Sequence, residues 1–306
     1  MAKNVYFVDG FVARNNVAGI VAYLEGHEEE FTRFYMFDAK AGKWGHREYN
    51  HQIVSAAYSK KGDSFHEDDA PFTWYLLSKR GVLIKRNQSG VSELPIPTAD
   101  TGPGRRGYVS RIKIIGSHFY VCGFGRQVYR LKNGAWDDIA PTLAVAPHET
   151  RYGFRDIDGF SENDIYAVGW QGEVFHFNGK KWTQIDVPTN VDFEGVRCVD
   201  NAIYVCGKRG VLLIGKNGAW DIHQDPEITE HFWGIEVFGG KVYLSHLKGL
   251  AYFDGTNIRP MATGLQPEVG GYRLHAKEGI LWSFGHEDLA YFDEASWQRV
   301  ICPDNV

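Results

Sequence analysis

The chain has 306 residues, of which 43% are hydrophobic and 23% are charged, a balance that excludes a disordered polypeptide. Its formal net charge of −5 gives no reason to expect a nucleic-acid partner. No run of eighteen apolar residues and no apolar signal segment are visible, so we expect neither membrane insertion nor secretion but a cytoplasmic protein.

Apolar strands that flank glycine-bearing turns recur along the chain. The segments 165–175 and 203–213 both follow this pattern, and 119–128 and 242–252 repeat it. The slot of Gly169 recurs every 38–46 residues, and in chain order it holds Ser78, Gly123, Gly169, Gly207, His246 and Gly285. A period near forty that contains four strand-sized segments is typical of a β-propeller blade.

Seven repeats account for the whole length, so we predict an all-β, seven-bladed β-propeller with four antiparallel strands per blade. The expected first strands begin near Val5, Ile53, Ile112, Arg155, Val196, Ile235 and Arg273. The expected blades of this single domain, 1–306, span approximately 4–50, 51–104, 105–150, 151–191, 192–230, 231–268 and 269–306. The first two blades are the least regular, with an enlarged turn at 25–30, an insertion at 63–69 and a loop rich in proline and glycine at 94–104. Because both ends hold whole blades, no strand needs to be shared between the termini.

Several recurring residues are predicted to have structural roles. A tryptophan in each of several repeats is expected to begin the outer strand and to wedge between blades: Trp44, Trp136, Trp182, Trp220 and Trp297. Cys122 and Cys206 share a slot within apolar strands, and none of the four cysteines has zinc-binding spacing, so we expect small buried hydrophobes. Acidic residues follow His27 and His66, but such turns are usually solvated, and no metal or cofactor is expected.

The stretch from Asp164 to Trp182 resembles the BNR-type repeat of photosystem II stability and assembly factor-like propellers, and is similar in style to WD-repeat blades. The resemblance extends from about Arg111 to Val300 and implies the fold. It does not imply an activity, because Phe175 and Phe177 stand where the serine and aspartate of an Asp box belong. Assembly factors, lectins, sialidases and toxin-neutralising proteins all use such scaffolds.

Catalytic motifs are scarce. The glycine-rich segment 102–107 lacks the spacing of a nucleotide-binding loop, and no G-x-S-x-G motif is present. A sialidase-like site would need several arginines near a tyrosine and a glutamate, for which the chain offers Arg105, Arg151, Arg273, Tyr272 and Glu236. The missing Asp boxes argue against it, so we do not expect an enzyme.

A recognition surface is the favoured interpretation of the loops. In a propeller, the loops that lead into each first strand share one face with the turns between the second and third strands. Aromatic and arginine side chains, which dominate binding hot spots, recur in these loops. The predicted partner-binding residues are Tyr108, Arg126, Arg151, Trp170, Arg209, Phe232, Trp233, Tyr272 and Arg273.

These residues predict a non-catalytic propeller that recognises another protein, as an adaptor, an assembly factor or an inhibitor of immunity type. An acidic protein surface would complement the arginines. A carbohydrate-binding propeller is the first alternative, although the loop residues differ between blades whereas a sugar lectin needs equivalent pockets. A glycoside hydrolase with two carboxylates across a cleft is the second.

Overall fold

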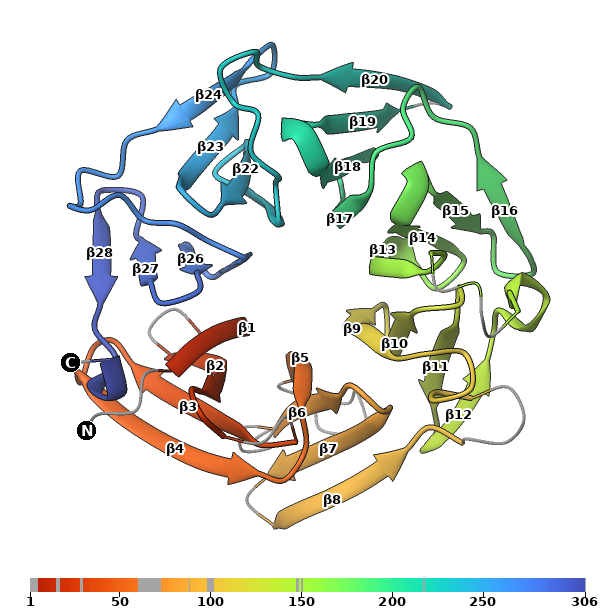
Figure 1. Ribbon diagram of the computed structural model, residues 1–306, viewed down its shortest axis with the longest axis horizontal. Helices are drawn as coiled ribbons and strands as arrows, with labels where there is room; N and C mark the ends of the chain where they lie inside the picture. The colour runs from red at the N-terminus through yellow and green to blue at the C-terminus, as the bar shows by residue number, and fades with distance from the viewer. Residues whose placement is uncertain are drawn as a thin grey trace. The chain divides into compact units, whose positions relative to one another are not determined.

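The computed structural model describes residues 5–14, 17–27, 30–59, 73–87, 89–97, 102–146, 149, 151–216 and 218–305. Over these residues, 28 strands form seven antiparallel sheets of four strands, each sheet ordered as its strands follow in the chain (Figure 1). The chain is therefore an all-β, seven-bladed β-propeller, as the sequence predicts. The insertion at 63–69 and part of the turn at 25–30 lie outside the described residues.

The chain divides into two compact units. Unit 1 comprises 1–53, 206–212 and 223–306, and unit 2 comprises 54–205 and 213–222. Three sheets belong to unit 1. They are β1 (Val5–Arg14), β2 (Val17–Leu24), β3 (Thr32–Asp38) and β4 (Lys43–Tyr49); β21 (Gly234–Phe238), β22 (Lys241–His246), β23 (Gly249–Phe253) and β24 (Ile258–Met261); and β25 (Arg273–Lys277), β26 (Ile280–Phe284), β27 (Leu289–Phe292) and β28 (Trp297–Val300).

Unit 2 contains two whole sheets and most of two others. They are β5 (Ile53–Ser59), β6 (Thr73–Ser78), β7 (Val82–Asn87) and β8 (Gly90–Pro95); β9 (Val109–Ile115), β10 (His118–Gly123), β11 (Val128–Lys132) and β12 (Ala135–Asp138); β13 (Phe154–Ser161), β14 (Asp164–Gly169), β15 (Val174–Phe177) and β16 (Trp182–Ile185); and β17 (Phe193–Val199), β18 (Ala202–Gly207), β19 (Leu212–Lys216) and β20 (Ala219–His223). Every first strand begins within three residues of its predicted start.

The predicted tryptophans all lie on the fourth strand of a sheet. In unit 2, the indole N–H of Trp136 donates to the carbonyl of Leu94 at 3.2 Å, and that of Trp182 donates to the carbonyl of Ile139 at 3.0 Å. Each indole thereby reaches the preceding blade. In unit 1, the ring of Trp297 is buried in a core shared by the last two blades. These tryptophans are structural, as the sequence predicts.

The recurrent glycine before the turn between the second and third strands is required by close backbone approach. A Cβ atom at Gly169 would lie 1.9 Å from the carbonyl oxygen of Gly153, and one at Gly123 would lie 2.5 Å from that of Tyr108. The glycine therefore lets the loop that leads into the first strand pass directly beneath the turn. Consequently the loops and the turns of a blade present their side chains together.

Side chains of one first strand accept hydrogen bonds from the next. In unit 2, Asp156 on β13 accepts from the N–H of Val196 on β17 at 3.1 Å. Asp156 also pairs with Arg111 on β9 and with Arg197 on β17, each at 3.3 Å. Burial raises the pKa of this carboxyl, but the cations Arg111, Lys113 and Arg197 outweigh it and bring the pKa below its ordinary value. One buried carboxylate thus links three blades.

The terminal blades take all four strands from their own end of the chain, so no strand is shared between the termini. A side-chain contact links these two sheets of unit 1. Asn305 accepts a hydrogen bond from the N–H of Val5 at 2.8 Å and donates to its carbonyl at 3.1 Å. Asp304 pairs with Arg33 at 2.6 Å. The prediction that each end holds a whole blade is confirmed.

All four cysteines are free thiols. Cys122, Cys206 and Cys302 are buried, as expected of small hydrophobes, and Cys198 is half-buried. Burial raises the pKa of the Cys122 thiol, which keeps it protonated at neutral pH.

Candidate partner-binding surfaces

In unit 2, three aromatic side chains from successive blades contact one another. Tyr108, in the loop before β9, meets Phe124 in the following turn at 6.3 Å between ring centroids. Phe124 in turn meets Trp170 of the next blade edge to face at 4.7 Å. Loops and turns therefore converge within this unit as the propeller topology predicts.

Cations cover the rings of this region. Lys79 Nζ lies 4.3 Å from the centroid of the Tyr108 ring, and the Arg155 guanidinium lies 6.0 Å from that of Trp170. Arg126 and Arg151 both approach Tyr152, at 4.7 and 5.4 Å. We call this region of unit 2 the basic aromatic surface, and it comprises Lys79, Arg80, Arg105, Tyr108, Phe124, Arg126, Arg151, Tyr152, Arg155 and Trp170.

Two of these arginines are bound by buried carboxylates of the neighbouring blade. Arg126 Nε lies 3.0 and 3.1 Å from the two carboxylate oxygens of Glu173, and the Nη2 atom also donates to that group. Arg155 Nε donates to Glu194 at 2.9 Å. Arg126, one of the predicted partner-binding residues, therefore also forms an ion pair within the fold. The Arg126 side chain remains 20% exposed, and its guanidinium lies against the rings of Tyr152 and Phe175.

A buried arginine supports the turn that presents Phe124 and Arg126. Arg106 Nη2 donates to the backbone carbonyls of Gly125 and Arg126, each at 3.2 Å, and Nη1 pairs with Asp138 at 3.0 Å. Arg126 itself has a φ of 57°, in the left-handed region. These hydrogen bonds fix the turn, so the half-buried side chains of Phe124 and Arg126 are preorganised.

In unit 1, a second row of aromatic side chains crosses three blades. Trp233, in the loop before β21, contacts Tyr272 edge to face at 5.6 Å. Tyr272 contacts His286 at 5.9 Å, and His286 contacts Tyr6 on β1 at 4.3 Å. Arg273 donates to the backbone carbonyl of Trp233, which fixes the position of this loop against the last blade.

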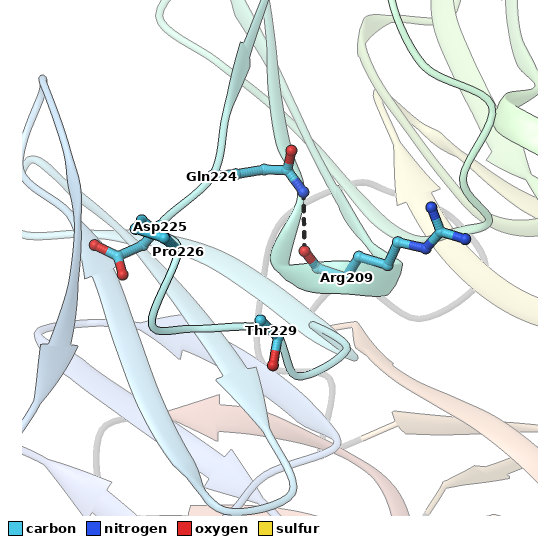
Figure 2. A pocket seen from close by; sticks show the side chains of 5 residues that line it. All are labelled: Arg209, Gln224, Asp225, Pro226 and Thr229. Carbon is cyan, nitrogen blue, oxygen red and sulfur yellow. Dashed lines mark hydrogen bonds between the residues drawn. The ribbon is translucent and has the colours of Figure 1, made fainter.

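Three hollows line up beside this row, and neighbouring hollows share a residue. The first, of about 500 Å³, is lined by Arg209, Gln224, Asp225, Pro226 and Thr229. Gln224 Nε2 donates to the backbone carbonyl of Arg209 at 3.0 Å, and the Arg209 guanidinium extends away from the other four residues (Figure 2). The backbone of Arg209 therefore borders this hollow, whereas its charged group is directed away from the other lining residues.

The other two hollows flank Leu247 at the tip of the β22–β23 hairpin. One, of about 350 Å³, is lined by Thr229, Glu230, His231, Trp233, Leu247 and Lys248. The other, of about 280 Å³, is lined by Leu247, Gly270, Gly271, His286, Glu287 and Asp288. We call these two hollows together the Leu247 groove. Leu247 is 54% exposed and lines both hollows, so an exposed apolar side chain lies between polar and charged residues.

The predicted residues divide between the two units. Tyr108, Arg126, Arg151 and Trp170 belong to the basic aromatic surface, and Trp233 lines the Leu247 groove. Tyr272 and Arg273 adjoin the groove through Trp233. Phe232 is fully buried, so its side chain is not available to a partner.

Sequence reasoning missed Leu247 and the carboxylates of Glu173 and Glu194. The sequence contained a signal that this turn differs from the others. His246 replaces the recurrent glycine, and only Leu247 and Lys248 lie between it and Gly249. The structure pairs His246 with Gly249 across this tight hairpin, which leaves Leu247 and Lys248 at its tip.

Among the residues that the structure describes, no group of three or more His, Cys, Asp or Glu side chains is placed to hold a metal ion. His27, next to one acidic turn, stacks on Phe31 at 4.7 Å. No helix in the described part of the chain has the length and apolar character needed to cross a membrane.

Comparison with known proteins shows the family to which the chain belongs. No family model matches the chain. The immune protein Tsi7 of Pseudomonas aeruginosa is 32% identical over 227 residues, which cover 73% of this chain and 74% of Tsi7. The chain belongs to the Tsi7 family. This relationship concerns most of the propeller, since three quarters of each protein align.

Solved structures confirm the fold of the Tsi7 family member. YCF48 from Cyanidioschyzon merolae matches with a TM-score of 0.68 at 14% identity and covers 100% of this chain and 98% of its own. A structure of YCF48 bound to a D1 peptide also matches with 0.68, at 11% identity, over 99% of this chain and 95% of its own. The WD40 propeller of Doa1 gives 0.63 at 10% identity, covering 99% and 95%. The predicted resemblance to photosystem II assembly factor-like and WD-repeat propellers is therefore confirmed at the level of fold.

Proposed function

We propose that this protein is a non-catalytic immunity protein that binds and neutralises a partner protein through its loop surfaces. The observation that carries the proposal is the family relationship to the immune protein Tsi7. The propeller supplies rigid sheets, and the loops carry aromatic side chains of the kind that form binding hot spots. The four free thiols accord with the cytoplasm as the proposed compartment.

The positive charge of the basic aromatic surface is the reason to propose an acidic patch on the partner. Arg105 and Arg80 are exposed, and Lys79 lies over the Tyr108 ring. Arg126, Arg155 and Arg151 pair with Glu173, Glu194 and Glu149. The positive charge available to a partner is therefore that of Lys79, beside Tyr108, and of the exposed Arg105. A partner carboxylate placed there would meet both an ammonium group and an aromatic edge.

A capture experiment tests the proposal. The tagged wild-type chain is used to capture its partner from the native cell, and the captured protein is then purified and titrated against variants. The double variant Tyr108→Ala/Trp233→Ala removes one aromatic anchor from each surface. Arg126 is left in place because its loss would leave the buried Glu173 unpaired.

We expect this variant to lose at least about thirtyfold in affinity, which corresponds to the roughly 2 kcal/mol of one hot-spot residue. The matched control is Val91→Ala/Ile222→Ala, which removes exposed side chains from the fourth strands β8 and β20. Equal affinity of the double variant and the wild type, at unchanged melting temperature, would refute binding through the loops. Turnover of a substrate by the purified chain would refute the non-catalytic role.

A further inference from the structure

The Leu247 groove contains a carboxylate that no lysine or arginine neutralises within the described part of the chain. Glu287 is 65% exposed at the side chain, and the contact recorded for it is His286 Nδ1 at 3.5 Å. The other acids of the groove are already paired, since Glu230 binds Lys248 at 2.8 Å and Asp288 binds Arg299. The free negative charge of the groove is therefore concentrated at Glu287.

Aromatic rings stand on the same side of the groove as this carboxylate. His286, adjacent to Glu287 in the chain, lies between the rings of Tyr6 and Tyr272. Burial raises the pKa of the Tyr6 phenol, and Glu25 and Glu287 raise it further. His286 contacts both tyrosine rings and its Nδ1 atom lies 3.5 Å from the carboxylate of Glu287, so the carboxylate and the rings meet at this histidine.

The floor of this hollow is backbone. Gly270 and Gly271 line it, and a Cβ at Gly271 would lie 2.5 Å from the hydroxyl oxygen of Ser283, so no larger residue fits there. A Cβ at Gly270 would lie 2.3 Å from the carbonyl oxygen of Leu247. The fold therefore favours glycine at both of these lining positions.

We propose that this hollow binds an arginine side chain of the partner protein, an inference that rests on the proposed function. A planar guanidinium forms a forked pair with a carboxylate and stacks on aromatic faces, which is the combination that Glu287 and His286 offer in this hollow. The aliphatic part of the arginine would lie against Leu247. This hollow would bind a positively charged side chain of the partner, whereas the basic aromatic surface would bind a negatively charged one. The proposed partner therefore carries both positive and negative groups on its binding surface.

A peptide titration tests the site without the partner. The probes are acetyl-Gly-Gly-Arg-Gly-Gly-amide and its citrulline analogue, which has nearly the same shape and no charge. The readout is the movement of the amide resonances of Leu247 and Gly271 in two-dimensional NMR spectra. We expect the arginine peptide to shift these resonances and the citrulline peptide to bind at least about fivefold more weakly.

Glu287→Gln should weaken binding of the arginine peptide by about fivefold or more, since the charge-assisted hydrogen bond becomes a neutral one. The matched control Glu294→Gln changes an exposed glutamate of the same blade, in the β27–β28 turn, and should leave binding unchanged. Equal binding of the two peptides, or a Glu287→Gln variant that binds like the wild type, would overturn the inference.

The captured partner provides the second arm. Glu287→Gln should weaken its binding by a similar factor, with faster dissociation, and Glu294→Gln should not. If the wild-type chain captures no partner, the proposed function fails, whereas the peptide result still decides whether the hollow accepts arginine. If the partner binds both variants equally well, the inference fails and the proposed function stands.

Discussion

The two candidate surfaces are built from equivalent loops of the blades, yet they treat charge in opposite ways. On the basic aromatic surface, Arg126 and Arg155 are fixed by the buried carboxylates of Glu173 and Glu194. In the Leu247 groove, Glu287 is 65% exposed and contacts His286 at 3.5 Å, and Leu247 is 54% exposed. Two arginines of the first surface are thus neutralised within the fold, whereas the second surface keeps a carboxylate and an apolar side chain exposed for a partner.

The turn between the second and third strands explains part of this difference. In the blades of β14 and β18 the turn contains Gln171 or Arg209 with a left-handed backbone, followed by a glycine that passes close to a backbone carbonyl. The β22–β23 turn is a hairpin with two residues between the paired His246 and Gly249, so it is shorter than these turns. The shorter hairpin leaves space on both sides of Leu247, and these spaces are the two hollows of the groove.

The largest expected effect concerns the ion pairs that hold unit 2 together. Asp156→Asn should lower the free energy of unfolding by about 3–5 kcal/mol, because the two largely buried arginines Arg111 and Arg197 then lose the negative charge that they share. The measurement is chemical denaturation. As a control, Asp137→Asn breaks the more exposed pair with Arg130 and should cost less than about 1 kcal/mol. Equal losses would show that burial of the pair does not matter.

The lowered pKa of Asp156 leads us to expect that the free energy of unfolding depends on pH. Because the folded pKa of Asp156 lies below its unfolded value, its contribution is complete above the unfolded pKa and disappears as the pH falls through the folded pKa. Unfolding free energies measured from pH 6 down to pH 3 should therefore fall less steeply for Asp156→Asn than for the wild type. Parallel curves would contradict the assignment.

A smaller loss is expected when the basic aromatic surface loses an internal carboxylate. Glu173→Gln should cost about 2–3 kcal/mol, since Arg126 is then left without its counter-charge in a partly buried position. The double variant Arg126→Met/Glu173→Met should recover most of this loss, because it removes both charges. A double variant as unstable as Glu173→Gln would show that the pair is not the cause.

The smallest expected change in stability is at the Leu247 groove. Leu247→Ala should change the free energy of unfolding by no more than about 0.5 kcal/mol, because the side chain is largely exposed. Its affinity for the partner should nevertheless fall by about tenfold. Ile222→Ala, at an exposed aliphatic residue on β20, should alter neither quantity. If Leu247→Ala destabilises the protein strongly, the residue is part of the fold and not of a binding surface.

The blades could be predicted from the sequence because each repeat carries its own signals. The recurrent glycine before the turn and the tryptophan of the fourth strand mark positions whose structural need is local, as Gly169 and Trp182 show. The state of the loop side chains could not be predicted in this way. Arg126 and Glu173 are 47 residues apart, and Arg155 and Glu194 are 39 apart, so each pair exists only after neighbouring blades pack. The burial of Phe232 also follows from tertiary packing, since its N–H bonds to the carbonyl of Gly207 in the preceding blade and its ring lies 6.2 Å from that of His246.

The most direct test of partner recognition is the dissociation constant of the purified partner for the wild type, Trp233→Ala and Ile222→Ala. The account predicts that Trp233→Ala binds at least about thirtyfold more weakly at an unchanged melting temperature, and that Ile222→Ala binds like the wild type. A Trp233→Ala variant with wild-type affinity would contradict it.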